Sequence, residues 1–173
     1  MDIDKIKKSI RNVPDFPKPG IQFKDITTLL QDHDAFKEAI EAFYDAFKDE
    51  KIDVIVGIES RGFIFAAPLA LKLGCRFVLA RKRGKLPGET VKEEYDLEYG
   101  TDLIEMHKND INADDRVLIV DDLLATGGTA KAVGSLVSKL DGEIISYAFL
   151  IELTALNGRL NLEPIPIFNI LKY

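Results

Sequence analysis

The stretch Val120-Asp-Asp-Leu-Leu-Ala-Thr-Gly-Gly-Thr129 decides the fold and the chemistry that we expect of this chain. Residues 117–120 form a continuous, largely β-branched apolar run, which is typical of a strand buried on both faces of a parallel sheet. We expect that strand to end at Asp121, with a helix over residues 129–140 after the glycine-rich turn. Backbone N–H groups of the turn and the positive end of the helix predict an anion site beside two carboxylates.

The carboxylates limit what this anion can be. A lone phosphate gains nothing from Asp121 and Asp122, so the ligand should also carry sugar hydroxyls or a divalent cation. A sugar phosphate with a magnesium-bound diphosphate satisfies both requirements. The alternative is a strand, a helix N-cap and a flexible turn without any ligand.

Helix and strand patterns alternate along most of the chain. We expect strands at 53–58, 75–80, 116–120 and 143–150, and helices at 34–49, 62–73 and 129–140. This alternation predicts a three-layer α/β domain around a parallel sheet with right-handed crossovers. Ligands of such sheets bind at the carboxyl ends of the strands. The polar stretches 59–62, 81–85 and 121–129 each follow a predicted strand, so we expect them to converge at one edge.

Three segments lie outside this pattern. Residues 2–11 resemble an amphipathic helix, and a turn-rich stretch at 16–20 follows. Residues 81–100 are long for a structureless connection, so they form either a functional lid or partly a hairpin. Residues 164–168 resemble an edge or capping strand.

Composition bounds the class of protein. With 173 residues, 46% hydrophobic and 30% charged, the chain fits one globular domain, 1–173. The net charge of -6 weighs against general nucleic-acid binding, which needs many cations. No apolar run is long enough to span a membrane, and no signal peptide is evident. The single cysteine, Cys75, excludes an intramolecular disulfide, which favours a reducing cytoplasmic setting.

The motif at 120–129, with 117–119 before it, resembles the phosphoribosyl-diphosphate signature of the type I phosphoribosyltransferases. Within that family, the form at 123–129 is most similar to members that act on adenine. The resemblance covers nearly the whole chain. It implies a type I phosphoribosyltransferase fold with an N-terminal hood over 1–30 that recognises the base, and a flexible catalytic loop over 81–100. It further implies a homodimer, Mg²⁺ held mainly by the substrate rather than by protein ligands, and synthesis of AMP and diphosphate from adenine and phosphoribosyl diphosphate.

The resemblance also implies roles for individual residues. The 5'-phosphate would bind to Ala125, Thr126, Gly127, Gly128, Thr129 and Ala130, and the ribose hydroxyls to Asp121 and Asp122. The diphosphate would bind to Arg61, Arg81, Lys85 and Tyr99. The base would lie against Gln22, Phe23 and Lys24, and Glu98 would handle the proton at N7 of the purine. A cis peptide would join Glu59 to Ser60.

Several alternatives remain open from the residues alone. Phe23 is equally well explained as a core side chain. The alternative for Arg61 is a surface salt-bridge residue, and the alternative for Glu98 is a solvated carboxylate. The base could be hypoxanthine, guanine or xanthine. A non-catalytic regulator that senses phosphoribosyl diphosphate and binds nucleic acid would need a basic module that the acidic chain does not supply.

Overall fold

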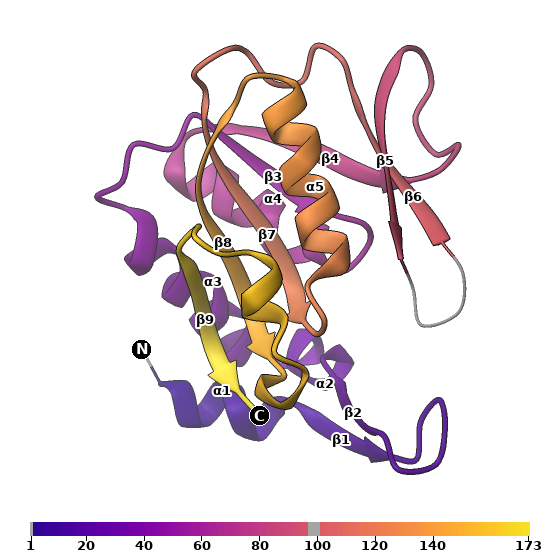
Figure 1. The fold of residues 1–173 in the computed structure, drawn as a ribbon. Coiled ribbons are helices and arrows are strands. Elements are labelled where there is room, and N and C mark those ends of the chain that lie inside the picture. Colours follow the sequence, from indigo (N-terminus) through magenta and orange to yellow (C-terminus); the bar gives the residue numbers. More distant parts are fainter. Residues whose placement is uncertain (1, 97–100) are drawn as a thin grey trace.

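The computed structural model describes residues 2–96 and 101–173, and within that part the chain forms two sheets. The larger sheet has seven strands in the order β5-β6-β4-β3-β7-β8-β9 (Figure 1). Its strands are β3 Val54–Ile58, β4 Arg76–Lys82, β5 Thr90–Asp96, β6 Thr101–His107, β7 Arg116–Leu124, β8 Glu143–Glu152 and β9 Ile167–Lys172. The smaller sheet pairs β1 Arg11–Pro14 with β2 Gln22–Asp25. The helices are α1 Ile3–Ser9, α2 Thr27–Gln31, α3 His33–Phe47, α4 Gly62–Leu73 and α5 Gly128–Lys139, with 3-10 turns at Thr154–Leu156 and Gly158–Asn161.

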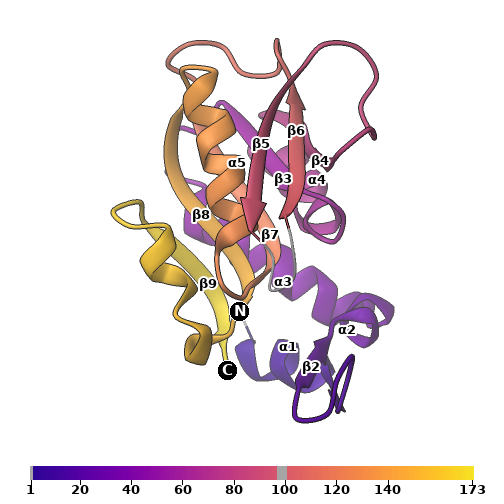
Figure 2. The same cartoon turned by 45° about the vertical axis from the view of Figure 1, so that its right-hand side comes forward.

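Five neighbouring strands of this sheet, β4, β3, β7, β8 and β9, are parallel to one another. Helices cover both faces of the sheet, which confirms the expected three-layer α/β architecture. Alternate residues of β3 belong to opposite cores because successive side chains of a strand point to opposite faces. Ile55 packs with α3 and α4, whereas Val54 and Val56 pack with α5. Figure 2 shows α5 in front of β7 and β8, with α3 and α4 behind the sheet.

Local sequence explains where the helices begin and end. Asp32 caps α3 by accepting hydrogen bonds from the N–H groups of Asp34 and Ala35. Helix α4 ends at Gly74, whose positive φ of 70° is the left-handed conformation that glycine adopts readily. The predicted helix at 62–73 is therefore confirmed at both ends.

The structure corrects two expected boundaries. Strand β7 does not end at Asp121 but continues to Leu124, because its last residues pair with β8 as far as Glu152. The segment 81–100 is not mainly a loop. Residues Thr90–Asp96 form β5, which pairs antiparallel with β6, so the hairpin that we left open as an alternative is present.

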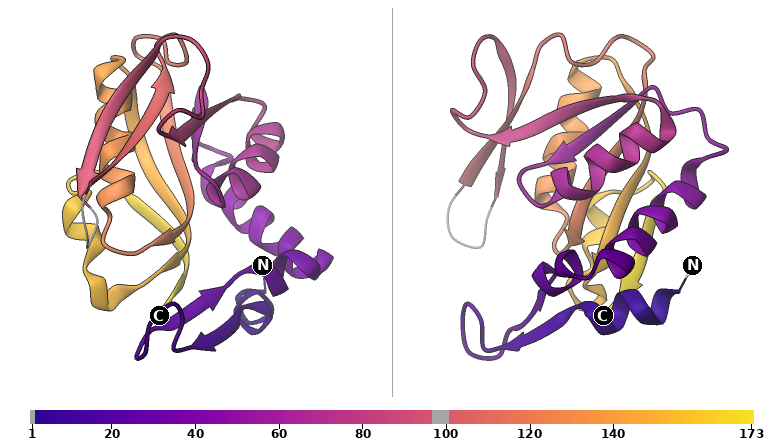
Figure 3. Two further views of the ribbon diagram at one scale, coloured as in Figure 1. Left: turned by 90° about the vertical axis from the view of Figure 1, so that its right-hand side faces the viewer. Right: turned by 180° about the vertical axis from the view of Figure 1, so that it is seen from behind.

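The N-terminal elements form a cap that shares its apolar core with α3 and the large sheet through Ile6, Ile26 and Leu29. Helices α1 and α2 and the β1–β2 hairpin lie beyond the carboxyl ends of β7 and β8, as the two views of Figure 3 also show. The predicted C-terminal strand is present as β9 at the edge of the sheet, although it begins at Ile167. Cys75 is half-buried just before β4. In the part of the chain that the structure describes, no helix is long and apolar enough to cross a membrane.

Candidate functional site

A cavity of about 260 Å³ lies where several strands of the large sheet end. It is lined by Glu59, Ser60, Arg61, Lys82, Tyr95, Ile104, Asp121, Asp122, Leu123 and Thr129. These residues come from the segments after β3, from β4, β5, β6 and β7, and from the start of α5. The three polar stretches therefore converge at one edge of the sheet, as the parallel topology predicted.

The two carboxylates of β7 form an electrostatic pair with Arg61. Asp122 is 5% exposed, and its Oδ2 atom lies 3.0 Å from Nε of Arg61. Burial raises the pKa of Asp121 well above its ordinary value, and the neighbouring Asp122 charge raises it further. Burial also raises the pKa of Asp122, which the Arg61 guanidinium opposes. Of the two cations that line the cavity among the described residues, Arg61 thus pairs with the buried Asp122 carboxylate.

The turn after β7 forms a smaller cavity of about 80 Å³, lined by Asp121 and by residues 123–130. The N-cap of α5 is Gly127, whose φ is +83°, and no side chain caps the helix. The first backbone N–H groups of this twelve-residue helix are therefore available to an anion. All six residues predicted for the 5'-phosphate line this cavity.

The segment 158–161 supports that turn from outside. The amide of Asn161 donates a hydrogen bond to the Thr126 carbonyl oxygen at 2.8 Å. A Cβ on Gly158 would lie 2.2 Å from the Ala125 carbonyl oxygen, so only glycine fits there. Neither contact could be predicted from local sequence, because Gly158 and Asn161 lie more than 30 positions beyond the residues that they contact.

The structure separates the cations of 81–85. The Arg81 guanidinium makes two hydrogen bonds to the Glu59 carboxylate, each at 3.2 Å, and is not among the side chains that line the cavity. Lys85 does not line it either, and its carbonyl oxygen accepts from Arg81. Lys82, which we did not select, lines the cavity instead. Strand alternation could have suggested this, since Arg81 and Lys82 must point to opposite faces.

The predicted base-recognition segment approaches the same cavity through Phe23. The Arg61 guanidinium carbon lies 5.7 Å from the centroid of the Phe23 ring, and Phe16 contacts that ring edge-on at 5.1 Å. Phe23 is half-buried and Phe16 is 52% exposed, so this aromatic pair is not a closed core. The site and the hood are thus joined by a cation–π contact.

The side chains of Gln22 and Lys24 are engaged within the hood. Gln22 accepts a hydrogen bond from the Asn12 amide at 2.6 Å, and the Lys24 ammonium donates to Oδ1 of Asn12 at 3.1 Å. The Lys24 ammonium also lies 4.2 Å from the ring centroid of Tyr173, at the C-terminus. Their strand, β2, pairs on one side with β1 in a two-stranded sheet. Its other edge presents backbone donors and acceptors, which suits recognition of a flat polar ring.

Two predicted residues, Glu98 and Tyr99, lie outside the described residues. The peptide bond between Glu59 and Ser60 is cis, as the resemblance implied. Within residues 2–96 and 101–173, no group of three or more His, Cys, Asp or Glu side chains converges to hold a metal ion.

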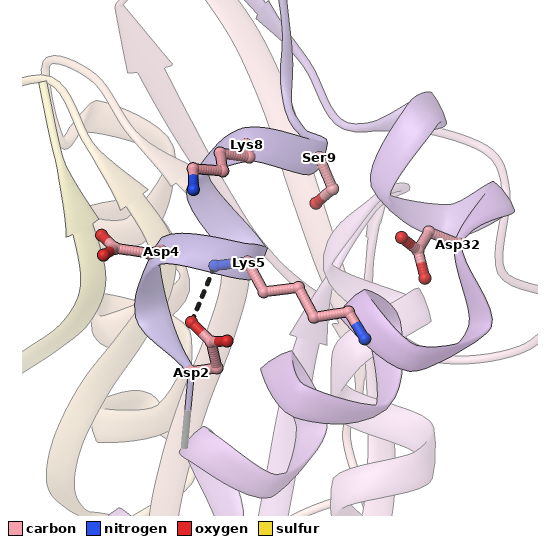
Figure 4. Close-up of a pocket in the computed structure, with 6 residues that line it drawn as sticks. All are labelled: Asp2, Asp4, Lys5, Lys8, Ser9 and Asp32. Atoms are coloured by element: carbon pink, nitrogen blue, oxygen red, sulfur yellow. Dashed lines mark hydrogen bonds between the residues drawn. The ribbon is translucent and has the colours of Figure 1, made fainter.

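A third cavity, of about 350 Å³, lies on α1 and is shown in Figure 4. Three of its charged residues, Asp2, Lys5 and Asp32, already have structural partners. Asp2 accepts from the Lys5 N–H at 3.0 Å, Asp32 caps α3, and the Lys5 ammonium pairs with Asp34 at 3.3 Å. We therefore assign this surface no role in the chemistry of the strand ends.

Comparison with known proteins agrees with the geometry. The family model described as the phosphoribosyl transferase domain matches residues 25–162. The chain belongs to the phosphoribosyltransferase family, and its architecture is the type I fold of that family.

The relatives are more specific. Adenine phosphoribosyltransferase of Cyanothece sp. is 56% identical over 97% of this chain and 99% of its own length. The crystal structure of adenine phosphoribosyltransferase from Thermoanaerobacter pseudethanolicus matches with a TM-score of 0.96 and 51% identity, covering 99% of this chain and all of that one. The enzyme of Saccharomyces cerevisiae, solved with an imino-altritol bisphosphate and adenine, matches with a TM-score of 0.92 and 45% identity over 97% of both chains.

Proposed function

We propose that this protein transfers a 5-phosphoribosyl group from phosphoribosyl diphosphate to adenine, giving AMP and diphosphate in purine salvage. The observation that supports this most is the shared cavity of Arg61, Asp122 and Thr129, which places a cation, a carboxylate and the phosphate turn around one space. The relatives named adenine phosphoribosyltransferase add the choice of base.

In this proposal the 5'-phosphate binds to the turn 125–130, where uncapped N–H groups of α5 meet it. The ribose hydroxyls donate to Asp121 and Asp122, which lie between the turn and Arg61. As the bond from C1 to diphosphate weakens, positive charge develops on the sugar ring. The adjacent carboxylates stabilise that charge, and binding of both ends of the substrate orients C1 toward the base.

The departing diphosphate is negatively charged and requires cations. Arg61 and Lys82 line the cavity and are assigned to it. Arg81 and Lys85 keep a supporting role here, because Arg81 holds Glu59 in place beside Arg61. Mg²⁺ is assigned as a substrate-borne ion that would neutralise the diphosphate, since among the described residues no three His, Cys, Asp or Glu side chains converge to hold a metal ion.

Adenine is assigned to the space between Phe23 and the cavity, with ring contact from Phe23 and backbone contacts from Gln22 and Lys24. The nearness of Phe23 to Arg61 supports this position. Glu98 is assigned to the proton at N7 and Tyr99 to closure over the diphosphate. Both follow directly after β5, whose residue Tyr95 lines the cavity.

We further propose a cytoplasmic homodimer. Lys85 lies outside the cavity of its own chain and is exposed, so it is available to a neighbouring subunit. Leu71 on α4 is 85% exposed, which an interface would cover. Sedimentation equilibrium at micromolar concentration tests this, and a monomer would exclude the dimer.

The deciding experiment is an AMP-formation assay with phosphoribosyl diphosphate and a panel of adenine, hypoxanthine, guanine and xanthine. We expect turnover with adenine, loss of turnover with EDTA, and recovery when Mg²⁺ is added. Use of hypoxanthine or guanine without adenine would refute the choice of base. Absence of turnover with every base, together with binding of phosphoribosyl diphosphate, would refute catalysis.

A further inference from the structure

Asp102 lies beside residues that line the cavity, near the end of the β5–β6 hairpin where β5 passes into β6. It is the second residue of β6, and its cross-strand partner is Tyr95, near the end of β5. Asp102 is not among the residues that line the cavity, whereas Lys82 and Tyr95 are. Any influence of this carboxylate on the substrate therefore acts through its neighbours.

Three groups converge on the Asp102 carboxylate. Its Oδ2 atom accepts a hydrogen bond from the Tyr95 hydroxyl at 3.2 Å and lies 3.4 Å from the Lys82 ammonium. Its Oδ1 atom accepts from the Leu103 N–H at 2.8 Å. These contacts, led by the backbone N–H, lower the pKa of Asp102 although partial burial opposes them, so the group is ionised at neutral pH.

Lys82 depends on this carboxylate for its orientation. Within the described residues, Asp102 is the one acid that pairs with the Lys82 ammonium. Glu59, the other nearby acid, accepts from the Lys82 backbone N–H and from Arg81. The Lys82 side chain is 57% exposed, so without Asp102 its long stem would sample many rotamers.

Tyr95 brings the network to the cavity itself. It is 9% exposed, and it lines the cavity together with Lys82 and with Thr129 in the first turn of α5. Asp102 thus contacts two residues that line the cavity, Lys82 and Tyr95. The contact between Asp102 and Tyr95 joins the two strands of the hairpin.

We propose that Asp102 is a positioning residue of the transferase, which aims the Lys82 ammonium at the diphosphate and holds the Tyr95 side chain in place against the same cavity. This rests on the proposed function of the cavity. Electrostatics alone predicts the opposite change in affinity. A negative charge beside an anionic substrate weakens binding, so removing the Asp102 charge would improve affinity for phosphoribosyl diphosphate if Asp102 did not position Lys82.

The test is steady-state kinetics of Asp102→Asn with phosphoribosyl diphosphate varied at saturating adenine. We expect KM for phosphoribosyl diphosphate to rise about tenfold, within the roughly hundredfold loss that a misplacement of about 1 Å can cause. The KM for adenine should change little, and Asp102→Glu should recover most of the affinity. An unchanged or lower KM for phosphoribosyl diphosphate in Asp102→Asn would overturn the proposal.

Glu89→Gln is the matched control. Glu89 also pairs with a lysine on this hairpin, Lys108 at 3.0 Å, but it lies at the opposite end of β5. We expect its kinetics to equal those of the wild type. Wild-type protein that makes no AMP would refute the proposed function instead, so the two failures are distinguishable.

Tyr95→Phe is a second test of the proposal. It can be used even if circular dichroism shows that Asp102→Asn does not fold. It removes only the hydroxyl, and we expect a similar rise in KM for phosphoribosyl diphosphate. Because both residues act in one network, the double variant should be no worse than the more affected single variant. Additive effects, or a Tyr95→Phe enzyme with wild-type KM, would contradict the network.

Discussion

The Nε atom of Arg61 lies 3.0 Å from Oδ2 of Asp122, so a guanidinium from the turn after β3 pairs with a buried carboxylate of β7. The arginine side chain is 39% exposed and the aspartate side chain 6%. Because the arginine faces the cavity, it can exchange one anionic partner for another without leaving the site. The same pair joins the two halves of the proposed substrate site, the cation for diphosphate and the carboxylate for ribose.

Arg61→Ala should reduce kcat/KM for phosphoribosyl diphosphate about thirtyfold or more. This corresponds to about 2 kcal/mol, the lower range for losing one partner of a buried charge pair. Arg76→Ala is the matched control, because Arg76 pairs with Asp115 near the amino-terminal ends of the strands and has a similarly exposed side chain. It should alter stability without altering the kinetics. Equal kinetic losses in both variants would contradict a specific role for Arg61.

Asp121→Asn should stabilise the protein at alkaline pH while abolishing binding of phosphoribosyl diphosphate. Burial raises the pKa of Asp121 well above its ordinary value of 3.8, so as pH rises the folded protein keeps a proton that the unfolded chain loses. Wild-type stability therefore falls as pH rises above about 4 toward the raised pKa.

Asparagine does not ionise, so the free energy of unfolding of Asp121→Asn does not fall with pH for this reason. Its advantage in the free energy of unfolding should be near zero at pH 4 and at least about 1 kcal/mol at pH 8, the scale of one pKa unit. Urea unfolding at both pH values measures it, with the exposed Asp49→Asn as control. A variant less stable than wild type at pH 8 would show that the carboxylate stabilises the fold.

Gly62→Ala should damage both stability and substrate binding. A Cβ there would lie 2.7 Å from the Val120 carbonyl oxygen and 2.9 Å from Oδ1 of Asp121, so β7 must shift. We expect a loss of about 1–3 kcal/mol and a higher KM for phosphoribosyl diphosphate. Gly134→Ala, whose Cβ would lie 2.1 Å from the Tyr147 hydroxyl, should lower stability alone. A normal KM in Gly62→Ala would mean that Asp121 tolerates the shift.

Glu98→Ala should lower kcat far more than it changes KM for phosphoribosyl diphosphate, since proton transfer in the transition state contributes about 10²- to 10⁴-fold. Rapid-quench measurement of AMP formation separates this step from product release. Glu89→Gln again serves as the carboxylate control on the hairpin. A near-normal kcat would remove Glu98 from the proton-transfer role.

The local sequence was sufficient to predict the features that depend on interactions between neighbouring residues. The helix at 62–73 is bounded as predicted, because Gly74 in the left-handed conformation ends it. The glycine-rich turn and the uncapped start of α5 also follow from a short stretch of residues. The convergence of three polar stretches was predictable, because parallel topology brings the carboxyl ends of strands to one edge.

Contacts between distant segments decided the rest. Pairing with β8 extends β7 past both aspartates, although the apolar pattern ends at Val120. The position of the Arg81 side chain depends on Glu59, which lies 22 residues earlier in the sequence and accepts hydrogen bonds from the Arg81 guanidinium.

By itself, the sequence determined the α/β class, the glycine-rich turn and the carboxylate pair, because each depends on periodicity or on neighbouring residues. Only the tertiary structure decided which cations line the cavity, what pairs with Asp122, and that Asp102 contacts both Lys82 and Tyr95. The physical reason is that successive side chains of a strand point to opposite faces of the sheet. Only the packing of the whole sheet decides which of the two faces lines the cavity.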